Sequence, residues 1–284
     1  MSFKTTASIA SFGGKLLKLT HDASTTGCTM ALNLYLPPNA SSSARVPVLF
    51  YLAGLTCTGD NCAEKGFFQS AASQKGIAVV YPDTSPRGLK IQGEDDAYDF
   101  GSGAGFYIDA TVSPWSKHYK MESYITSELP KALFSSFSEL DSSRVSITGH
   151  SMGGHGALTL FLKNPGMYMS VSAFAPISNP SQCPWGEKAF KGYLGEDREV
   201  WKEHDATELV KNWKGDFEAL VDVGTGDNFY KQKQLLPENL VDAAEKSGKK
   251  GLKVRYQDGY DHSYFFISTF ATDHVNYAAK YLLA

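Results

Sequence analysis

Cysteine is scarce in this sequence, and the cysteines that do occur are widely spaced. The 284 residues contain four of them: Cys28, Cys57, Cys62 and Cys183. This set does not make a disulfide framework, and no Cys-x-x-Cys or His-x-x-x-His pair supplies the spacing of a metal site. We therefore expect free thiols and no bound metal.

An excess of charge of either sign is also missing. Lysine and arginine total 27, aspartate and glutamate total 30, and no basic stripe is interleaved with aromatic residues. Binding to nucleic acid normally requires such a basic surface. We therefore expect no nucleic acid as a partner.

Long apolar runs are missing from residues 1–30, which carry polar or charged groups throughout. A signal peptide needs an uninterrupted apolar segment, and a membrane-spanning helix needs a longer one. We therefore expect no secretion signal, no membrane partner and a cytoplasmic location.

What the sequence does contain is an alternation of β-branched apolar runs with amphipathic stretches. The apolar runs predict strands at 46–53, 77–81, 145–148, 170–175, 220–223 and 252–256, with an antiparallel edge strand at 30–36. Helical periodicity predicts helices at 64–75, 121–137, 152–163, 231–246 and 265–283. This order is typical of an α/β fold with a mostly parallel central sheet and helices on both faces. No linker divides the chain, so residues 1–284 are expected to form a single domain.

A serine flanked by glycines lies where a predicted strand meets a predicted helix. Ser151 is the centre of a Gly-x-Ser-x-Gly pattern in the segment ITGHSMGGHG, between Gly149 and Gly153. Glycines are needed there because a Cβ would clash with the neighbouring strand and helix, and the hydroxyl then points out of the carboxyl edge of the sheet. We predict that Ser151 is a nucleophile rather than a passive turn residue, with the N–H of Met152 as one oxyanion donor.

A serine hydroxyl is inert at neutral pH unless a base lies within hydrogen-bond reach. Among the histidines after Ser151, His262 lies in a loop between the last predicted strand and the last predicted helix. His155 is one helical turn past the serine, and His204 and His274 lie in charged helical segments, where a solvated or capping role is expected. We therefore predict His262 as the base.

The base in turn needs a carboxylate that orients it. Asp227 follows the predicted strand 220–223 through a turn with two glycines, which brings it to the same edge of the sheet. Asp227 is the predicted acid, with Asp258 and Asp261 as alternatives.

The segment YLAGLTCT, after the strand 46–53, is expected to complete the oxyanion hole. Its backbone N–H at Leu55, freed by Gly54, is the predicted second donor. Cys57, two residues further on, is expected near the cavity, either as a spectator in the pocket wall or as a thiol whose modification blocks entry.

Several stretches together resemble the S-formylglutathione hydrolases, also called the esterase D family. The resemblance runs from about residue 13 to the C-terminal helix and rests on these segments: GLTCT (54–58), DTSPRG (83–88), YDFGSGAGFY (98–107), GHSMGGHGAL (149–158), FAPISNP (174–180), CPWGEKAF (183–190), YLG (193–195) and GYDHSYFF (259–266). It implies an α/β-hydrolase fold and hydrolysis of S-formylglutathione to glutathione and formate, with side activity on short acyl esters. It also implies a cofactor-free cytosolic enzyme, usually a homodimer, with the triad at Ser151, Asp227 and His262.

The same segments suggest a substrate pocket. We expect Trp185 to limit the acyl group to a very small size, with a packing role as the alternative, and the glycine-rich segment 101–105 with Phe106 to form a wall. Lys65, Arg87 and Lys188 are candidate cations for the carboxylates of glutathione. A general carboxylesterase or acyltransferase, and a binding protein with an inactive triad, remain the alternative functions.

Overall fold

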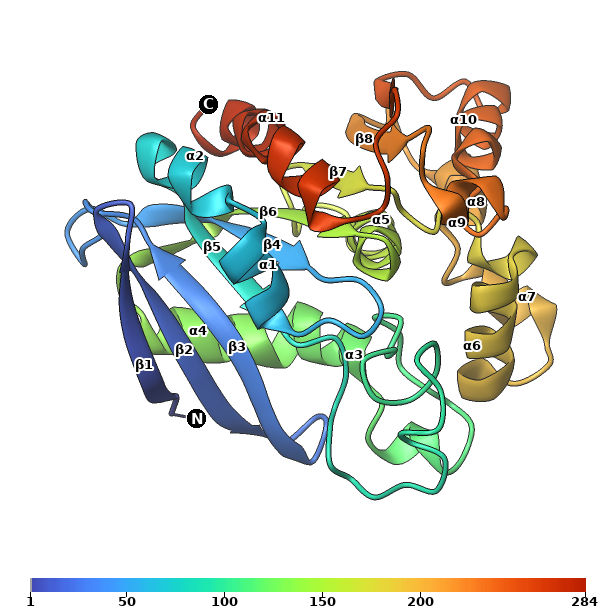
Figure 1. Ribbon diagram of the computed structural model, residues 1–284, viewed down its shortest axis with the longest axis horizontal. Coiled ribbons are helices and arrows are strands. Elements are labelled where there is room, and N and C mark those ends of the chain that lie inside the picture. Colours follow the sequence, from blue (N-terminus) through green and yellow to red (C-terminus); the bar gives the residue numbers. More distant parts are fainter. Residues whose placement is uncertain (1) are drawn as a thin grey trace.

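The computed structural model describes residues 2–284, in which nine strands form one sheet in the order β1-β2-β3-β5-β4-β6-β7-β8-β9 (Figure 1). Strands β4 to β9 pair in parallel, and β1 to β3 form an antiparallel extension that joins at β5. The expected mostly parallel sheet is therefore confirmed. The strands are β1 (Lys4–Ser11), β2 (Gly14–Ala23), β3 (Cys28–Leu36), β4 (Val46–Leu52), β5 (Ala78–Pro82), β6 (Leu140–His150), β7 (Val171–Phe174), β8 (Ala219–Gly224) and β9 (Leu252–Gln257).

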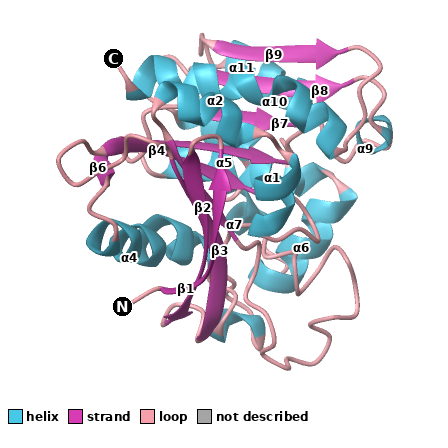
Figure 2. Cartoon of the chain, turned by 60° about the vertical axis from the view of Figure 1, so that its left-hand side comes forward, coloured by secondary structure: helices cyan, strands magenta, loops and turns pink. Residues whose placement is uncertain are grey.

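The centre of the sheet is its most buried part. Every residue of β4, β5, β7 and β8 is buried, as expected for parallel strands covered on both faces. Strand β1 is exposed at most positions on both sides, and β1 and β2 were not predicted. Figure 2 shows β1 to β3 turned across the direction of β7 to β9, which is the twist that accumulates over a large sheet.

Helices cover both faces of the sheet. Figure 1 shows α2 and α11 on one face and α4 and α5 on the other, and each of these helices contacts a central strand. The helices are α1 (Gly59–Lys65), α2 (Phe68–Lys75), α3 (Met121–Ser123), α4 (Leu129–Ser136), α5 (Met152–Lys163), α6 (Pro184–Leu194), α7 (Arg198–Lys202), α8 (Ala206–Leu209), α9 (Asn228–Lys231), α10 (Pro237–Lys246) and α11 (Tyr264–Leu282).

Some helix boundaries differ from the prediction. The helix expected at 64–75 is two helices, broken at Gly66 and Phe67, where Phe67 has a φ of 58°. The helix expected at 231–246 begins only at Pro237, while the one expected at 152–163 is confirmed as α5. Helix α6 was not predicted, and it packs against the long loop between β5 and β6 through Phe100 and Tyr193, whose rings stack 4.4 Å apart.

No helix among residues 2–284 combines the length and the apolar character needed to cross a membrane.

Candidate active site

Ser151 occupies a sharp turn between β6 and α5. Its backbone has φ 57° and ψ −118°, a conformation that L-residues with a side chain rarely adopt. A Cβ on Gly149 would lie 2.1 Å from the carbonyl oxygen of Gly153, and one on Gly153 would lie 2.0 Å from that of Leu52. Both flanking positions therefore require glycine, as the sequence pattern predicts.

A cavity of about 190 Å³ lies at this turn, at the carboxyl edge of the sheet. Residues distant in the sequence line it together: Gly54, Leu55, Thr56, Tyr98, His150, Ser151, Trp185, Phe229 and His262. The structure thus brings Ser151, His262 and Leu55 to one small, largely apolar space. Its volume is below the range of about 300–1,000 Å³ that is typical of sites for drug-sized ligands.

His262 is held by a carboxylate. Its Nδ1 lies 2.5 Å from Oδ2 of Asp227, which has no exposed surface. The other oxygen of Asp227 accepts hydrogen bonds from the N–H groups of Phe229 (2.7 Å) and Tyr230 (3.3 Å), because Asp227 caps the start of α9. An ionised carboxylate can only accept hydrogen bonds, so this contact places the imidazole proton on Nδ1 of His262 and leaves its Nε2 as the basic atom.

The two alternative acids bind elsewhere. Asp258 accepts from the hydroxyl of Thr225 at 3.1 Å, and Asp261 accepts from the N–H and the hydroxyl of Ser263. Asp227 is therefore the carboxylate that the structure pairs with His262.

The backbone around Leu55 approaches Ser151 closely. A Cβ on Gly54 would lie 3.1 Å from the Cβ of Ser151 and 3.2 Å from the carbonyl oxygen of His150. Within residues 2–284, no hydrogen bond uses the N–H of Leu55, and Met152 begins α5, so its N–H has no partner inside the helix. Both N–H groups are therefore available to a ligand atom beside Ser151.

His150 was not singled out from the sequence, where it looks like a variable position of the serine motif. It is buried, and its ring lies 4.6 Å from the ring of His262 and 6.0 Å from that of Tyr264. Burial, with a smaller contribution from His262, holds the pKa of His150 well below its usual value. His150 is thus a neutral neighbour that supports the ring of His262.

An aromatic wall closes one side of the cavity. The indole Nε1 of Trp185 donates to the hydroxyl of Tyr98 at 3.0 Å, and its ring packs against Phe229 at 4.6 Å. The Phe229 ring meets that of His262 edge-on at 4.9 Å. Trp185 therefore lines the cavity, and Tyr98, which was not predicted, is its partner from the β5–β6 loop.

Two expected pocket residues lie outside the cavity lining. Phe106 is buried, has a φ of 51° and does not line the cavity; its ring lies 6.0 Å from the ring of His155, and its carbonyl oxygen lies 3.0 Å from Nε2 of the same histidine. Cys57 is partly buried with its sulfur 4.0 Å from the hydroxyl of Tyr264, and burial raises the pKa of its thiol.

The expectation that His204 and His274 are solvated or capping is wrong. His274 is fully buried, where its Nε2 lies 3.0 Å from Asp222 and its ring stacks 3.6 Å from that of Phe174. The side chain of His204 is 11% exposed, and burial lowers its pKa to about 3. His274 lies on the inward face of α11, and His204 lies in the turn between α7 and α8, and the charged local sequence gives no sign of the burial of either.

The candidate cations differ in their availability. Arg87 is paired with Asp83, and Lys188 is paired with Asp99. Lys65 is exposed in the last turn of α1, with no ion-pair partner within residues 2–284.

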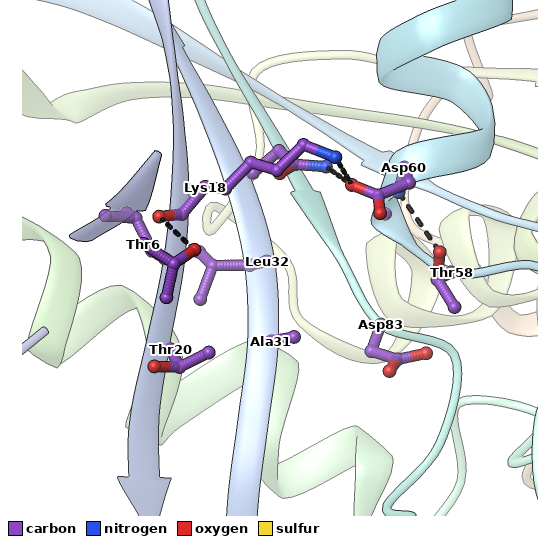
Figure 3. Close-up of a pocket in the computed structure, with 11 residues that line it drawn as sticks. Thr6, Lys18, Thr20, Ala31, Leu32, Thr58, Asp60 and Asp83 are labelled. Carbon is purple, nitrogen blue, oxygen red and sulfur yellow. Dashed lines mark hydrogen bonds and ion pairs between the residues drawn. The ribbon is translucent and has the colours of Figure 1, made fainter. Parts of the chain in front are cut away.

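A second cavity, of about 200 Å³, lies over β2, β3 and the start of α1 (Figure 3). Lys18 spans it and contacts Asp60 at 2.9 Å, and the hydroxyl of Thr6 donates to the carbonyl oxygen of Lys18. Its lining contains no histidine or cysteine, and its lysine is paired with Asp60, so it lacks the serine and histidine that meet at the Ser151 cavity.

All four cysteines are free thiols. Across residues 2–284, no group of three or more His, Cys, Asp or Glu side chains is arranged to hold a metal ion.

Comparisons with known proteins show which family the chain resembles. A family model described as "Putative esterase" matches residues 23–277. The S-formylglutathione hydrolase of Rattus norvegicus is 52% identical, with 100% of both chains covered, and that of Arabidopsis thaliana is 50% identical, with 95% of both covered. The solved structure of an S-formylglutathione hydrolase from Agrobacterium tumefaciens matches with a TM-score of 0.93 at 46% identity, covering 99% of this chain and 100% of that one.

Proposed function

Because the chain belongs to the S-formylglutathione hydrolase family of esterases, we propose that it hydrolyses S-formylglutathione to glutathione and formate. The observation that carries this proposal is the cavity that contains Ser151 and His262, with the imidazole held by the buried Asp227. The α/β-hydrolase fold places these groups at the carboxyl edge of the sheet, where the chemistry of this fold takes place.

In the first half of the reaction, the hydroxyl oxygen of Ser151 attacks the thioester carbonyl carbon while Nε2 of His262 takes the hydroxyl proton. The carbonyl oxygen becomes an oxyanion, which accepts hydrogen bonds from the N–H groups of Leu55 and Met152. The C–S bond then breaks, and glutathione leaves as a thiolate that recovers the proton from His262. A thiolate is a good leaving group, so acid assistance matters less here than in amide hydrolysis.

In the second half, water attacks the carbonyl carbon of formyl-Ser151. His262 takes a proton from the water, and the same two N–H groups bind the new oxyanion. The ester C–O bond breaks, the proton returns to Ser151, and the product leaves as formic acid, which loses its proton to water to give formate. Asp227 stays ionised throughout and stabilises the imidazolium that forms twice per cycle.

The small cavity supports a preference for a formyl group. A volume of about 190 Å³ walled by Trp185 and Phe229 has to hold the acyl group together with the carbonyl and the first atoms of the leaving group, which favours short acyl chains next to Ser151. Short acyl esters are the proposed side substrates. The cavity lining contains no lysine or arginine, so the two glutathione carboxylates are expected to bind outside it, with the exposed Lys65 as a candidate cation.

We also propose that the protein acts as a cytoplasmic homodimer without a cofactor, and that it binds neither nucleic acid nor membranes. The nearly balanced charge supports the last two points. Light scattering after gel filtration measures the mass, which for a dimer is twice the 31.0 kDa of one chain.

The deciding experiment compares kcat/KM for S-formylglutathione with that for a chromogenic acetate ester. We expect the thioester to be preferred by several orders of magnitude. Similar values for both substrates would favour a general carboxylesterase, and no turnover of either would favour a binding protein with an inactive triad.

A further inference from the structure

The loop that carries the predicted oxyanion donor Leu55 is in a strained conformation. Thr56, the next residue, has a φ of 66°, which is unfavourable for a β-branched side chain. Residues in such conformations keep them only when surrounding contacts over-determine the backbone. The direction of the Leu55 N–H therefore depends on what holds residues 54–57, which we call the oxyanion loop.

Contacts from two other segments hold the oxyanion loop. The N–H of Thr56 donates to the carbonyl oxygen of Gly103 at 2.9 Å. The carbonyl oxygen of Cys57 accepts two hydrogen bonds, from the hydroxyl of Thr84 at 2.5 Å and from Nη2 of Arg87 at 3.1 Å. The last two contacts come from Thr84 and Arg87, in the segment that follows β5.

Arg87 is itself fixed by a nearly buried carboxylate. Its Nε lies 2.9 Å from Oδ2 of Asp83 and its Nη2 lies 3.0 Å from Oδ1, so the pair is bidentate. Asp83 is 5% exposed and directly follows β5, and it also accepts from the N–H of Thr84 at 2.7 Å. The guanidinium is therefore a rigid bridge between the end of a central strand and the Cys57 carbonyl.

We propose that Arg87 is a positioning residue that holds the oxyanion loop in its catalytic conformation through the carbonyl oxygen of Cys57. This inference rests on the proposed function of the site, because it assigns the Leu55 N–H to the oxyanion. It replaces the expectation that Arg87 guides glutathione, since two of its three nitrogens already bind groups of the protein.

The chemistry of the bridge requires arginine. One planar guanidinium binds both carboxylate oxygens and still directs an N–H to a third acceptor, whereas a lysine ammonium is a single point with no such fork. A lysine at position 87 keeps the charge beside Asp83 but loses the fixed geometry at the Cys57 carbonyl.

The test compares Arg87→Lys with a matched control, Arg144→Lys. Arg144, which lies in β6 far from the cavity, likewise joins a carboxylate to a backbone carbonyl, with Nε 2.7 Å from Oδ2 of Asp141 and Nη2 3.0 Å from the carbonyl oxygen of Arg45, although its contact with the carboxylate is single. Thr84→Val is a second variant, which removes the other hydrogen bond to Cys57 while leaving the Asp83–Arg87 pair in place. Each variant is assayed with S-formylglutathione and with a chromogenic acetate ester, after titration of active serines.

We expect Arg87→Lys to lower kcat on the order of 10-fold with KM changed less than 2-fold, since full loss of one oxyanion donor costs about 10²–10³-fold. Trifluoroacetone, a small ketone that forms a hemiketal oxyanion with the serine, should bind more weakly by the same factor. Thr84→Val should act in the same direction, and Arg144→Lys should match the wild type.

Three results would overturn the proposal. The first is a rise in KM with kcat unchanged in Arg87→Lys, which would assign Arg87 to substrate binding. The second is a fall in kcat in Arg87→Lys without weaker binding of trifluoroacetone. The third is wild-type kinetics in both Arg87→Lys and Thr84→Val. Failure of the wild-type protein to hydrolyse S-formylglutathione would contradict the proposed function instead, and the acetate ester would still report on Arg87.

Discussion

Asp227 accepts hydrogen bonds at both carboxylate oxygens: Oδ1 accepts from the backbone N–H groups of Phe229 and Tyr230, and Oδ2 accepts, at 2.5 Å, from Nδ1 of His262. The carboxylate thus couples the position of the base to the first turn of a helix. Asn at this position keeps the shape, but its NH₂ group cannot accept the Nδ1 proton.

We predict that Asp227→Asn lowers kcat by about 10⁴-fold, because the imidazole is driven into the wrong tautomer. Steady-state kinetics with S-formylglutathione measure this effect, and circular dichroism checks the fold. Asp261→Asn is the matched control and should retain most of the activity, since Asp261 bonds to Ser263. Comparable losses in both variants would contradict the assignment of the acid.

Ser151→Ala should abolish turnover and leave the fold intact. Alanine keeps the Cβ that the turn already accommodates at φ 57°, so the strain of the backbone is the same in both proteins. A fluorophosphonate probe should label the wild type and not the variant. Substantial residual hydrolysis would show that another residue is the nucleophile.

Trp185→Ala should shift the substrate preference toward longer acyl groups. The ratio of kcat/KM for butyrate and acetate esters should rise about 10- to 200-fold, the range that one pocket contact gives for small apolar groups. Tyr98→Phe is the control, because it removes only the hydrogen bond to the indole while keeping the ring. An unchanged ratio in Trp185→Ala would assign the tryptophan to packing alone.

The buried Asp222 should make stability sensitive to acid. Burial alone raises its pKa, but hydrogen bonds from His274 and Arg255 outweigh this and hold the pKa at about 2. A carboxyl group with a depressed native pKa stabilises the fold above its unfolded pKa of about 3.9, and this contribution is lost as the pH falls toward 2. The contribution amounts to about 2–3 kcal/mol.

Urea unfolding of the wild type and Asp222→Asn measures this contribution as the part of their stability difference that disappears as the pH falls. The variant should lose about 3–5 kcal/mol at neutral pH, because it leaves a buried network without its charge. The difference should shrink between about pH 4 and pH 2. Asp273→Asn, which removes the more exposed partner of Arg255, should cost about 1 kcal/mol or less. A difference that is constant with pH would contradict the depressed pKa.

Local sequence patterns predicted the parts of the molecule whose structure is determined locally. Helix α5 follows directly from its apolar periodicity, and the turn at Ser151 follows from glycines that no other residue can replace. Strand β1 was missed because it is exposed on both sides and shows no alternation. His262 was identified by its place in the chain order, since the contact with Asp227 joins loops 35 residues apart.

The missed features of the site depend on contacts between distant segments. Tyr98 and Trp185 are 87 residues apart, and nothing in either local sequence indicates their hydrogen bond. The role of His150 is visible only in the folded structure, where its ring lies beside the ring of His262. The bonding of Arg87 to the Cys57 carbonyl likewise requires the pairing of β4 with β5, which brings the segments after the two strands together.

The groups that react and the groups that surround the acyl chain come from different parts of the chain. Ser151, Asp227 and His262 directly follow β6 or lie in the loops after β8 and β9, whereas Tyr98 and Trp185 come from the insertions after β5 and β7. Insertions tolerate change better than a buried sheet does. Substitutions in these two peripheral segments can therefore change which acyl chains the protein accepts, while the residues that cleave the bond stay in place.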